Sequence, residues 1–122
     1  MADTHLDPNV LSALQEVMED EYPELLDTFI RDSEERLKLL QNYADAMQLR
    51  DAAHSFKGSS SNMGAIRLAE LCHELEQRAN QKSLAGIEKL VGEIDGEFAI
   101  VRPLYEAEKQ RFSPSNLTAR RF

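Results

Sequence analysis

The sequence predicts an all-helical protein, an antiparallel four-helix bundle with a short additional N-terminal helix. Its 122 residues include only five glycines and four prolines, and no stretch alternates apolar and polar residues for long enough to indicate a strand. Residues that favour helix (Ala, Leu, Glu, Gln and Arg) are abundant throughout. Apolar residues recur at spacings of three and four, so each segment has one stripe that it must bury against its neighbours.

The first two predicted helices each begin at a proline. Asp7 followed by Pro8 is typical of an N-cap and the first helical position, and this helix should end near Asp20, with its stripe formed by Val10, Leu11, Leu14, Val17 and Met18. Pro23 opens a second helix that runs to about Tyr43, with a stripe formed by Tyr22, Leu25, Leu26, Phe29, Ile30, Leu37 and Leu40.

Two further helices follow at short spacing. Asp45 with Gln48 three residues later resembles a capping box and predicts a helix that starts at Ala46. Its stripe consists of Leu49, Ala53, Phe56, Ser60 and Met63. Gly64 is a natural C-terminal stop, and the next helix should cover residues 65–80, with Leu68, Leu71, Cys72, Leu75 and Ala79 facing inward.

Ser83 is the predicted N-cap of the last helix, which Pro103 should kink because proline removes a backbone donor. The stripe of this helix consists of Leu84, Ile87, Val91, Ile94, Phe98, Val101 and Tyr105. We expect a single domain over residues 1–110 and a flexible tail over residues 111–122. The residues before the first helix, His5 included, should also be mobile.

Composition excludes several function classes. The net charge is -8, with -9 carried by residues 1–47 and +1 by residues 48–122, so nucleic acid is not the expected partner. No apolar run approaches the ~20 residues that cross a bilayer, and no secretory signal is recognisable at the N-terminus. The lone Cys72 cannot form an internal disulfide. We therefore expect a cytoplasmic protein without a membrane segment.

The third predicted helix carries the residues that suggest chemistry. At 100° per residue, His54 lies about 140° from Leu49 at the middle of the apolar stripe, so its imidazole should face solvent. Helix geometry places Arg50, Lys57, Gly58 and Ser61 around it on the same surface.

Each of these residue types suits phosphoryl chemistry at an imidazole. Imidazole is partly neutral near pH 7, and a neutral ring nitrogen can attack phosphorus. Lys57 would screen the charge of an arriving phosphate. Gly58 costs the helix roughly 1 kcal/mol relative to alanine, and clearance for a partner's active site beside the ring would account for it.

Residues 53–65 (AHSFKGSSSNMGA), followed by 68–72 (LAELC) and 75–76 (LE), resemble the signature of histidine-containing phosphotransfer (HPt) domains. The general resemblance covers residues 6–108. Met63 stands where leucine is more usual, and Ser60 where alanine is common. The resemblance implies a four-helix bundle and a phosphorelay intermediate, in which a receiver-domain aspartate of a hybrid sensor kinase phosphorylates His54 and a response-regulator aspartate then receives the phosphoryl group. Lys57 would be the charge-screening residue and Gly58 the clearance residue.

In such a relay the Mg²⁺ would belong to the partner receiver domain, so this chain needs no metal site or cofactor of its own. No Gly-rich nucleotide loop is present, and the expected role is a phosphocarrier without kinase activity. The docking surface should surround His54, with Met47 near its centre and Arg50 and Ser61 at its rim, and we expect a monomer.

Other functions were weighed against this prediction. Exposed histidines on helices are common, so a helical adaptor in which His54 is incidental is the alternative. Glu70 with His73 matches one Glu-x-x-His element of di-metal bundles, but those sites need two, and His73 should point outward. A hydrolase is disfavoured because the sequence has no nucleophile elbow and Cys72 is predicted to face inward. Residues 109–122 carry four bases and no acid and could contact nucleic acid or an acidic surface, but a short disordered end is the favoured interpretation.

Overall fold

The structure, a computed structural model, describes residues 5–112, and these contain no β-strand. The elements are α1 (Pro8–Met18), the 3-10 turn η1 (Glu19–Glu21), α2 (Tyr22–Gln41), α3 (Ala46–Asn62), α4 (Ile66–Asn80) and α5 (Ile87–Arg111). The predicted all-helical class is confirmed. No helix within this range is both long and apolar enough to cross a bilayer.

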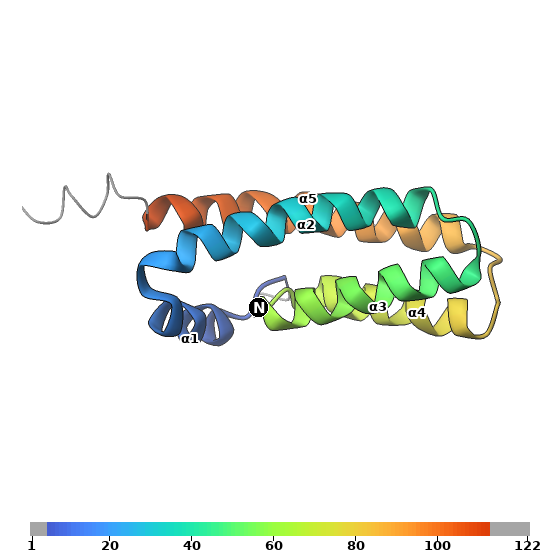
Figure 1. The fold of residues 1–122 in the computed structure, drawn as a ribbon, viewed down its shortest axis with the longest axis horizontal. Coiled ribbons are helices and arrows are strands. Elements are labelled where there is room, and N and C mark those ends of the chain that lie inside the picture. Colours follow the sequence, from blue (N-terminus) through green and yellow to red (C-terminus); the bar gives the residue numbers. More distant parts are fainter. Residues whose placement is uncertain (1–4, 113–122) are drawn as a thin grey trace, which may run out of the picture.

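The four long helices form an antiparallel bundle (Figure 1). Helices α2 and α5 lie side by side in one layer, and α3 and α4 in the other. The layers are joined because α2 also packs on α3, and α4 on α5. Helix α1 folds back at the end of the bundle where α2 begins. This is the predicted bundle with a short additional helix.

The predicted apolar stripes form most of the core. On α3 and α4 every predicted inward residue is buried. Cys72 is among them, and burial raises the pKa of its thiol to about 12, so it is a core residue and not a nucleophile. The stripe of α1 is the exception, because none of its residues is fully buried and Val17 is 79% exposed.

Helix α3 has the ends that its sequence predicts. The backbone N–H of Gln48 donates to the Asp45 carboxylate at 2.8 Å, which caps the first turn. At the other end Gly64 adopts a left-handed φ of +76°. The N–H groups of Gly64 and Ala65 then donate to the carbonyls of Ser61 and Ser60 at 3.1 and 2.8 Å, which is a Schellman motif.

The predicted start of the last helix is wrong by three residues. Lys82 has a φ of +56°, and the N–H of Ser83 donates to the carbonyl of Arg78 at 2.9 Å. Ser83 therefore belongs to the end of α4 and is not the N-cap of α5, which is Gly86. The chain turns instead at Gly86, which has a φ of +78°, and α5 begins at Ile87.

Helix α5 continues through Pro103 and ends at Arg111. Its neighbour Phe112 is half-buried, and its ring meets that of Tyr22 edge-on with 5.1 Å between the ring centroids. The rest of the predicted tail, residues 113–122, lies outside the described residues.

The segment before α1 is held in place, contrary to the mobility expected for His5. The N–H of Asp7 donates to the carbonyl of Gly64 at 2.8 Å, and the N–H of Ile66 donates to the carbonyl of His5 at 3.2 Å. Leu6 between them is buried. The imidazole Nδ1 of His5 also lies 2.6 Å from the buried carboxylate of Glu97 on α5. We call residues 5–7 the N-terminal strap, since they fasten the α3–α4 turn to α5.

Candidate functional site

His54 lies on the exposed face of α3, as predicted, with 67% of its side chain accessible. Its Nδ1 is 2.8 Å from a carboxylate oxygen of Glu76 on the neighbouring helix α4. Glu76 is only 14% exposed. The imidazole is therefore held at Nδ1 by a mostly buried carboxylate, while the rest of the ring stays open to solvent.

The protonation state of Glu76 decides which ring nitrogen of His54 has a free lone pair. Partial burial alone would raise the pKa of this carboxyl, but hydrogen bonds and charge from Lys57 and His54 outweigh burial and lower the pKa. An ionised carboxylate can only accept, so Nδ1 of His54 must carry the proton that joins them. In the neutral ring, Nε2 then holds the lone pair and is the nucleophilic atom.

Lys57 lies one turn from His54, and its ammonium group is 2.7 Å from the second oxygen of Glu76. One carboxylate thus holds both the imidazole and the lysine. The ion pair of Lys57 with Glu76 holds the lysine charge beside the imidazole. Lys57 is partly exposed there, so its charge could screen that of a bound phosphate.

Gly58 faces open space on the same side of α3. A Cβ placed there would have no neighbouring atom within 4 Å, so the fold itself does not require glycine at this position. The residue opens onto a groove of about 520 Å³ between α3 and α4, whose lining includes Ser61 and His73.

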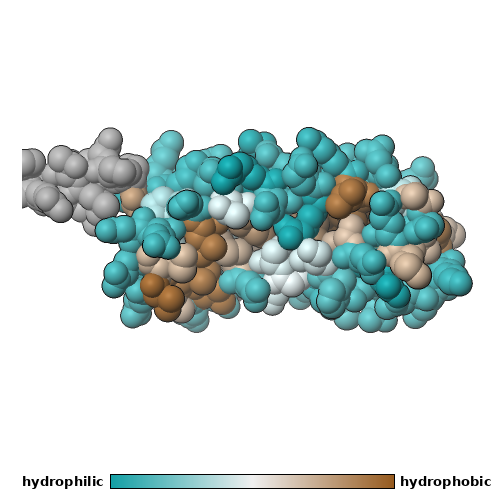
Figure 2. Space-filling view, viewed as in Figure 1, coloured by the Kyte–Doolittle hydropathy of each residue, from teal (hydrophilic) through white to brown (hydrophobic). Residues whose placement is uncertain are grey.

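The residues expected at the docking surface are all accessible. Met47 is 63% exposed, Ser61 is exposed, and Arg50 is partly exposed and pairs with the adjacent Asp51 at 3.0 Å. Figure 2 shows a mostly hydrophilic face with hydrophobic patches toward its two ends. Met47 is one of six large apolar side chains that are exposed on the described part of the chain.

Sequence reasoning gave no role to Glu76, the residue that orients His54. A signal was available, because the turn between α3 and α4 lies at Gly64 and Ala65. In an antiparallel hairpin, residues equally far from the turn face each other, and 54 and 76 are equidistant from 65. The contact of Arg36 with Ser55, described below, was also missed.

The Glu-x-x-His element on α4 holds no assembled metal site. His73 is exposed, as predicted, and Glu70 pairs with Arg67 at 3.7 Å. Among residues 5–112, no three His, Cys, Asp or Glu side chains are grouped so that they could hold a metal ion.

Fold and site together define a helical bundle that presents an accessible histidine, His54, whose imidazole is oriented by a carboxylate from the next helix. A model of the Hpt domain family matches residues 24–102, and the chain belongs to this family.

Known relatives agree. The chain is 32% identical over 75 residues to phosphorelay protein LuxU from two strains of Vibrio vulnificus, an alignment that covers 59% of this chain and 65% of LuxU. The alignment thus spans slightly less than two thirds of the length of these curated relatives. The crystal structure of histidine-containing phosphotransfer protein B (HptB) from Pseudomonas aeruginosa PAO1 superposes with a TM-score of 0.86 at 54% identity, covering 92% of this chain and all of HptB.

Proposed function

We propose that this protein is a phosphorelay intermediate that accepts a phosphoryl group on Nε2 of His54 and passes it to an aspartate of a partner receiver domain. Membership of the Hpt family and the similarity to a phosphorelay protein and to a histidine phosphotransfer protein support this role. The observation that carries the assignment is the exposed imidazole whose Nδ1 is bound by Glu76, which leaves Nε2 free to react.

The transfer step needs alignment more than covalent help. The lone pair of Nε2 attacks the phosphorus of an aspartyl phosphate, the bond from phosphorus to the aspartate oxygen breaks, and its electrons return to the carboxylate. The imidazole becomes positively charged as the new bond forms, and the Glu76 carboxylate at Nδ1 stabilises that charge. The reverse sequence at a second receiver releases the phosphoryl group.

Two residues beside His54 have roles in the proposed transfer. Lys57, held by Glu76, screens the negative charge of the phosphoryl group. Gly58 leaves room for the acceptor aspartate to approach the ring, because one turn along a helix brings side chains to the same surface.

Receiver domains of hybrid sensor kinases and response regulators are the proposed partners. They would dock over His54, with the side chain of Met47 near the centre of the contact and Arg50 and Ser61 at its rim. The Mg²⁺ for the reaction would be held by the receiver, and this chain would act as a carrier without kinase activity. Its monomeric state and its cytoplasmic location stay predictions.

Chemical labelling tests the assignment. Phosphoramidate, or a phosphorylated receiver domain with Mg²⁺, should label the protein with a base-stable, acid-labile phosphate, and His54→Gln should lose the label while keeping its melting temperature. His73→Gln is the matched control, because it removes another exposed imidazole close to the site. Label retained by His54→Gln would contradict the assignment, and a wild-type chain that is never labelled would indicate an adaptor.

A further inference from the structure

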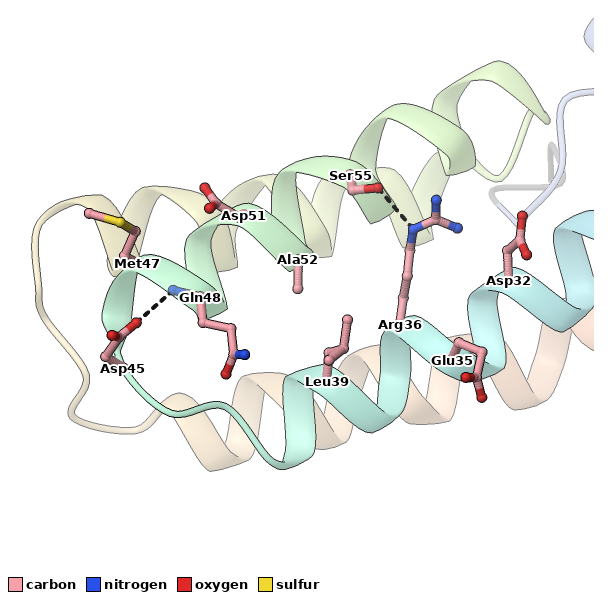
Figure 3. Close-up of a pocket in the computed structure, with 10 residues that line it drawn as sticks. All are labelled: Asp32, Glu35, Arg36, Leu39, Asp45, Met47, Gln48, Asp51, Ala52 and Ser55. Atoms are coloured by element: carbon pink, nitrogen blue, oxygen red, sulfur yellow. Dashed lines mark hydrogen bonds between the residues drawn. The ribbon is translucent and has the colours of Figure 1, made fainter.

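A groove of about 720 Å³ runs between α2 and α3, next to the helix face that carries His54 (Figure 3). Leu39 and Ala52 point into it from opposite helices, and Met47 lies at its end near the α2–α3 connection. Leu39 is 45% exposed. Four carboxylates also line the groove, those of Asp32, Glu35, Asp45 and Asp51.

Arg36 is the single cation of this groove. It extends from α2 toward α3, where its Nε donates to the hydroxyl of Ser55 at 3.0 Å (Figure 3). Ser55 follows His54 directly in the chain, so this contact fixes the guanidinium beside the phosphotransfer site.

The guanidinium of Arg36 has no carboxylate within 4 Å among the residues that the structure describes. Within residues 5–112 each of the other six arginines lies within 4 Å of an Asp or Glu oxygen, these being Arg31, Arg50, Arg67, Arg78, Arg102 and Arg111. Asp32, one turn away on α2, could pair with Arg36 by helix spacing, yet the arginine points to Ser55 instead. Its Nη1 is buried and has no hydrogen-bond partner.

We propose that Arg36 is a recognition residue for the partner receiver domain, which places a carboxylate on the guanidinium and an apolar side chain on Leu39 and Ala52. This inference rests on the proposed phosphotransfer at His54 and goes beyond it by naming the contact that selects the partner. A guanidinium binds a carboxylate through two parallel hydrogen bonds, so the contact specifies direction as well as charge. Because Nη1 of Arg36 is buried in the free protein, the guanidinium must turn slightly to donate to both oxygens of the partner's carboxylate.

The acidic lining makes this contact selective. A receiver surface with a carboxylate opposite Arg36 gains an ion pair, whereas carboxylates placed elsewhere along the groove would meet Asp32 or Asp45 and be repelled. The groove thus favours one position of the partner, in which its carboxylate meets Arg36 and avoids the acidic residues of the groove.

The variant Arg36→Met tests the proposal, because it keeps the aliphatic stem and removes the charge and the donors. We expect the dissociation constant for the receiver domain that exchanges phosphate with the wild-type protein to rise at least about tenfold, as measured by titration calorimetry. The transfer rate at saturating receiver should stay near the wild-type rate, and the receiver concentration for half-maximal rate should rise. The melting temperature should equal or exceed that of wild type, since the variant removes a buried, unpartnered donor.

The matched control is Arg31→Met on the same helix, where the arginine is exposed, pairs with Asp27 and does not line the groove. It should leave the dissociation constant unchanged. A fall in melting temperature in Arg36→Met with no change in the dissociation constant would show that Arg36 only ties α2 to α3, and would overturn the proposal.

A charge exchange identifies the carboxylate. Arg36→Glu should prevent binding, and one acidic residue of the receiver, when replaced by lysine, should restore it. Loss of binding that no such receiver variant restores would overturn the carboxylate assignment. The absence of phosphate exchange in the wild-type protein would overturn the proposed function and this inference together, whereas normal exchange with an unchanged dissociation constant in Arg36→Met would overturn the inference alone.

Discussion

The carboxylate of Glu76 connects the two cationic side chains of the site. It accepts from Nδ1 of His54 with one oxygen and pairs with Lys57 through the other. Sequence patterns found His54, Lys57 and Gly58 because they lie three and four residues apart on one helix. They did not find Glu76, because periodicity shows which face of a helix is exposed and not which residue of another helix lies opposite.

Replacing Glu76 by glutamine should change how stability depends on pH. The folded state lowers the pKa of Glu76 below its ordinary value of 4.5, so its contribution to the free energy of unfolding is complete above that value. The contribution is lost as the pH falls through the folded-state pKa. Glu76→Gln should therefore be less stable than wild type at pH 7, by roughly 1 kcal/mol, and the two should converge as the pH falls below the folded-state pKa of Glu76.

Urea denaturation of both proteins between pH 7 and pH 3 measures this difference. Glu70→Gln is the control, since Glu70 is an exposed glutamate of the same helix and makes only a long pair with Arg67. A difference between wild type and Glu76→Gln that did not shrink on acidification would show that the ionised carboxylate is not what stabilises the site.

At the scale of the helix, the sequence predicted the N-caps of α1 and α3 correctly but not the connection between α4 and α5. Asp7 and Asp45 cap α1 and α3 as expected, because an N-cap is a local interaction between a side chain and the next turn. Ser83 has the right side chain for a cap, but it lies in the Schellman motif that ends α4, and α5 begins only at Ile87. That motif places Lys82 in the left-handed region, where a sequence pattern would expect glycine or asparagine.

Two glycines at and near the end of α3 should respond to alanine in opposite directions. Gly64 has a φ of +76°, and a Cβ there would lie 3.1 Å from the Cβ of Val10, so Gly64→Ala should destabilise the protein by at least about 1 kcal/mol. Gly58 is in a helix with free space around it, so Gly58→Ala should stabilise by up to about 1 kcal/mol.

Thermal unfolding of the two variants beside wild type measures both effects. Destabilisation by Gly58→Ala would mean that this position needs a glycine backbone, and the clearance role proposed for it would have to be abandoned.

Across the whole molecule, the folding unit extends beyond the range that the family model matches. Residues 24–102 exclude Tyr22 and Tyr105, which are fully buried, and the N-terminal strap. The hydroxyl of Tyr105 donates to the carbonyl of Met63 at 2.6 Å, and that of Tyr22 donates to Glu108 at 2.8 Å. Helix pairing and core stripes were predictable from the sequence, but these long-range polar contacts were not, because nothing in a local pattern specifies a partner many residues away.

A fragment of residues 24–102 should therefore be much less stable than a fragment of residues 5–112. It loses two buried tyrosines and Leu6 from the core, and truncation of large buried side chains costs roughly 3 to 5 kcal/mol each. Circular dichroism melts of both fragments should show a cooperative transition for the longer one and a weak or much lower one for the shorter. Melting temperatures within a few degrees of each other would show that the ends of the chain do not support the fold.

The contact of His54 with Glu76 also limits where this chain can be lengthened. One residue inserted into the turn at Gly64 and Ala65 would break the Schellman hydrogen bonds that place the end of α3 against the start of α4, so it would disturb the contact of the Glu76 carboxylate with the imidazole. An insertion in the connection at residues 83–85, which is largely exposed, would leave that pairing unchanged. We therefore expect this chain to tolerate a one-residue insertion between α4 and α5 better than one at the α3–α4 turn, as thermal unfolding of the two insertion variants would measure.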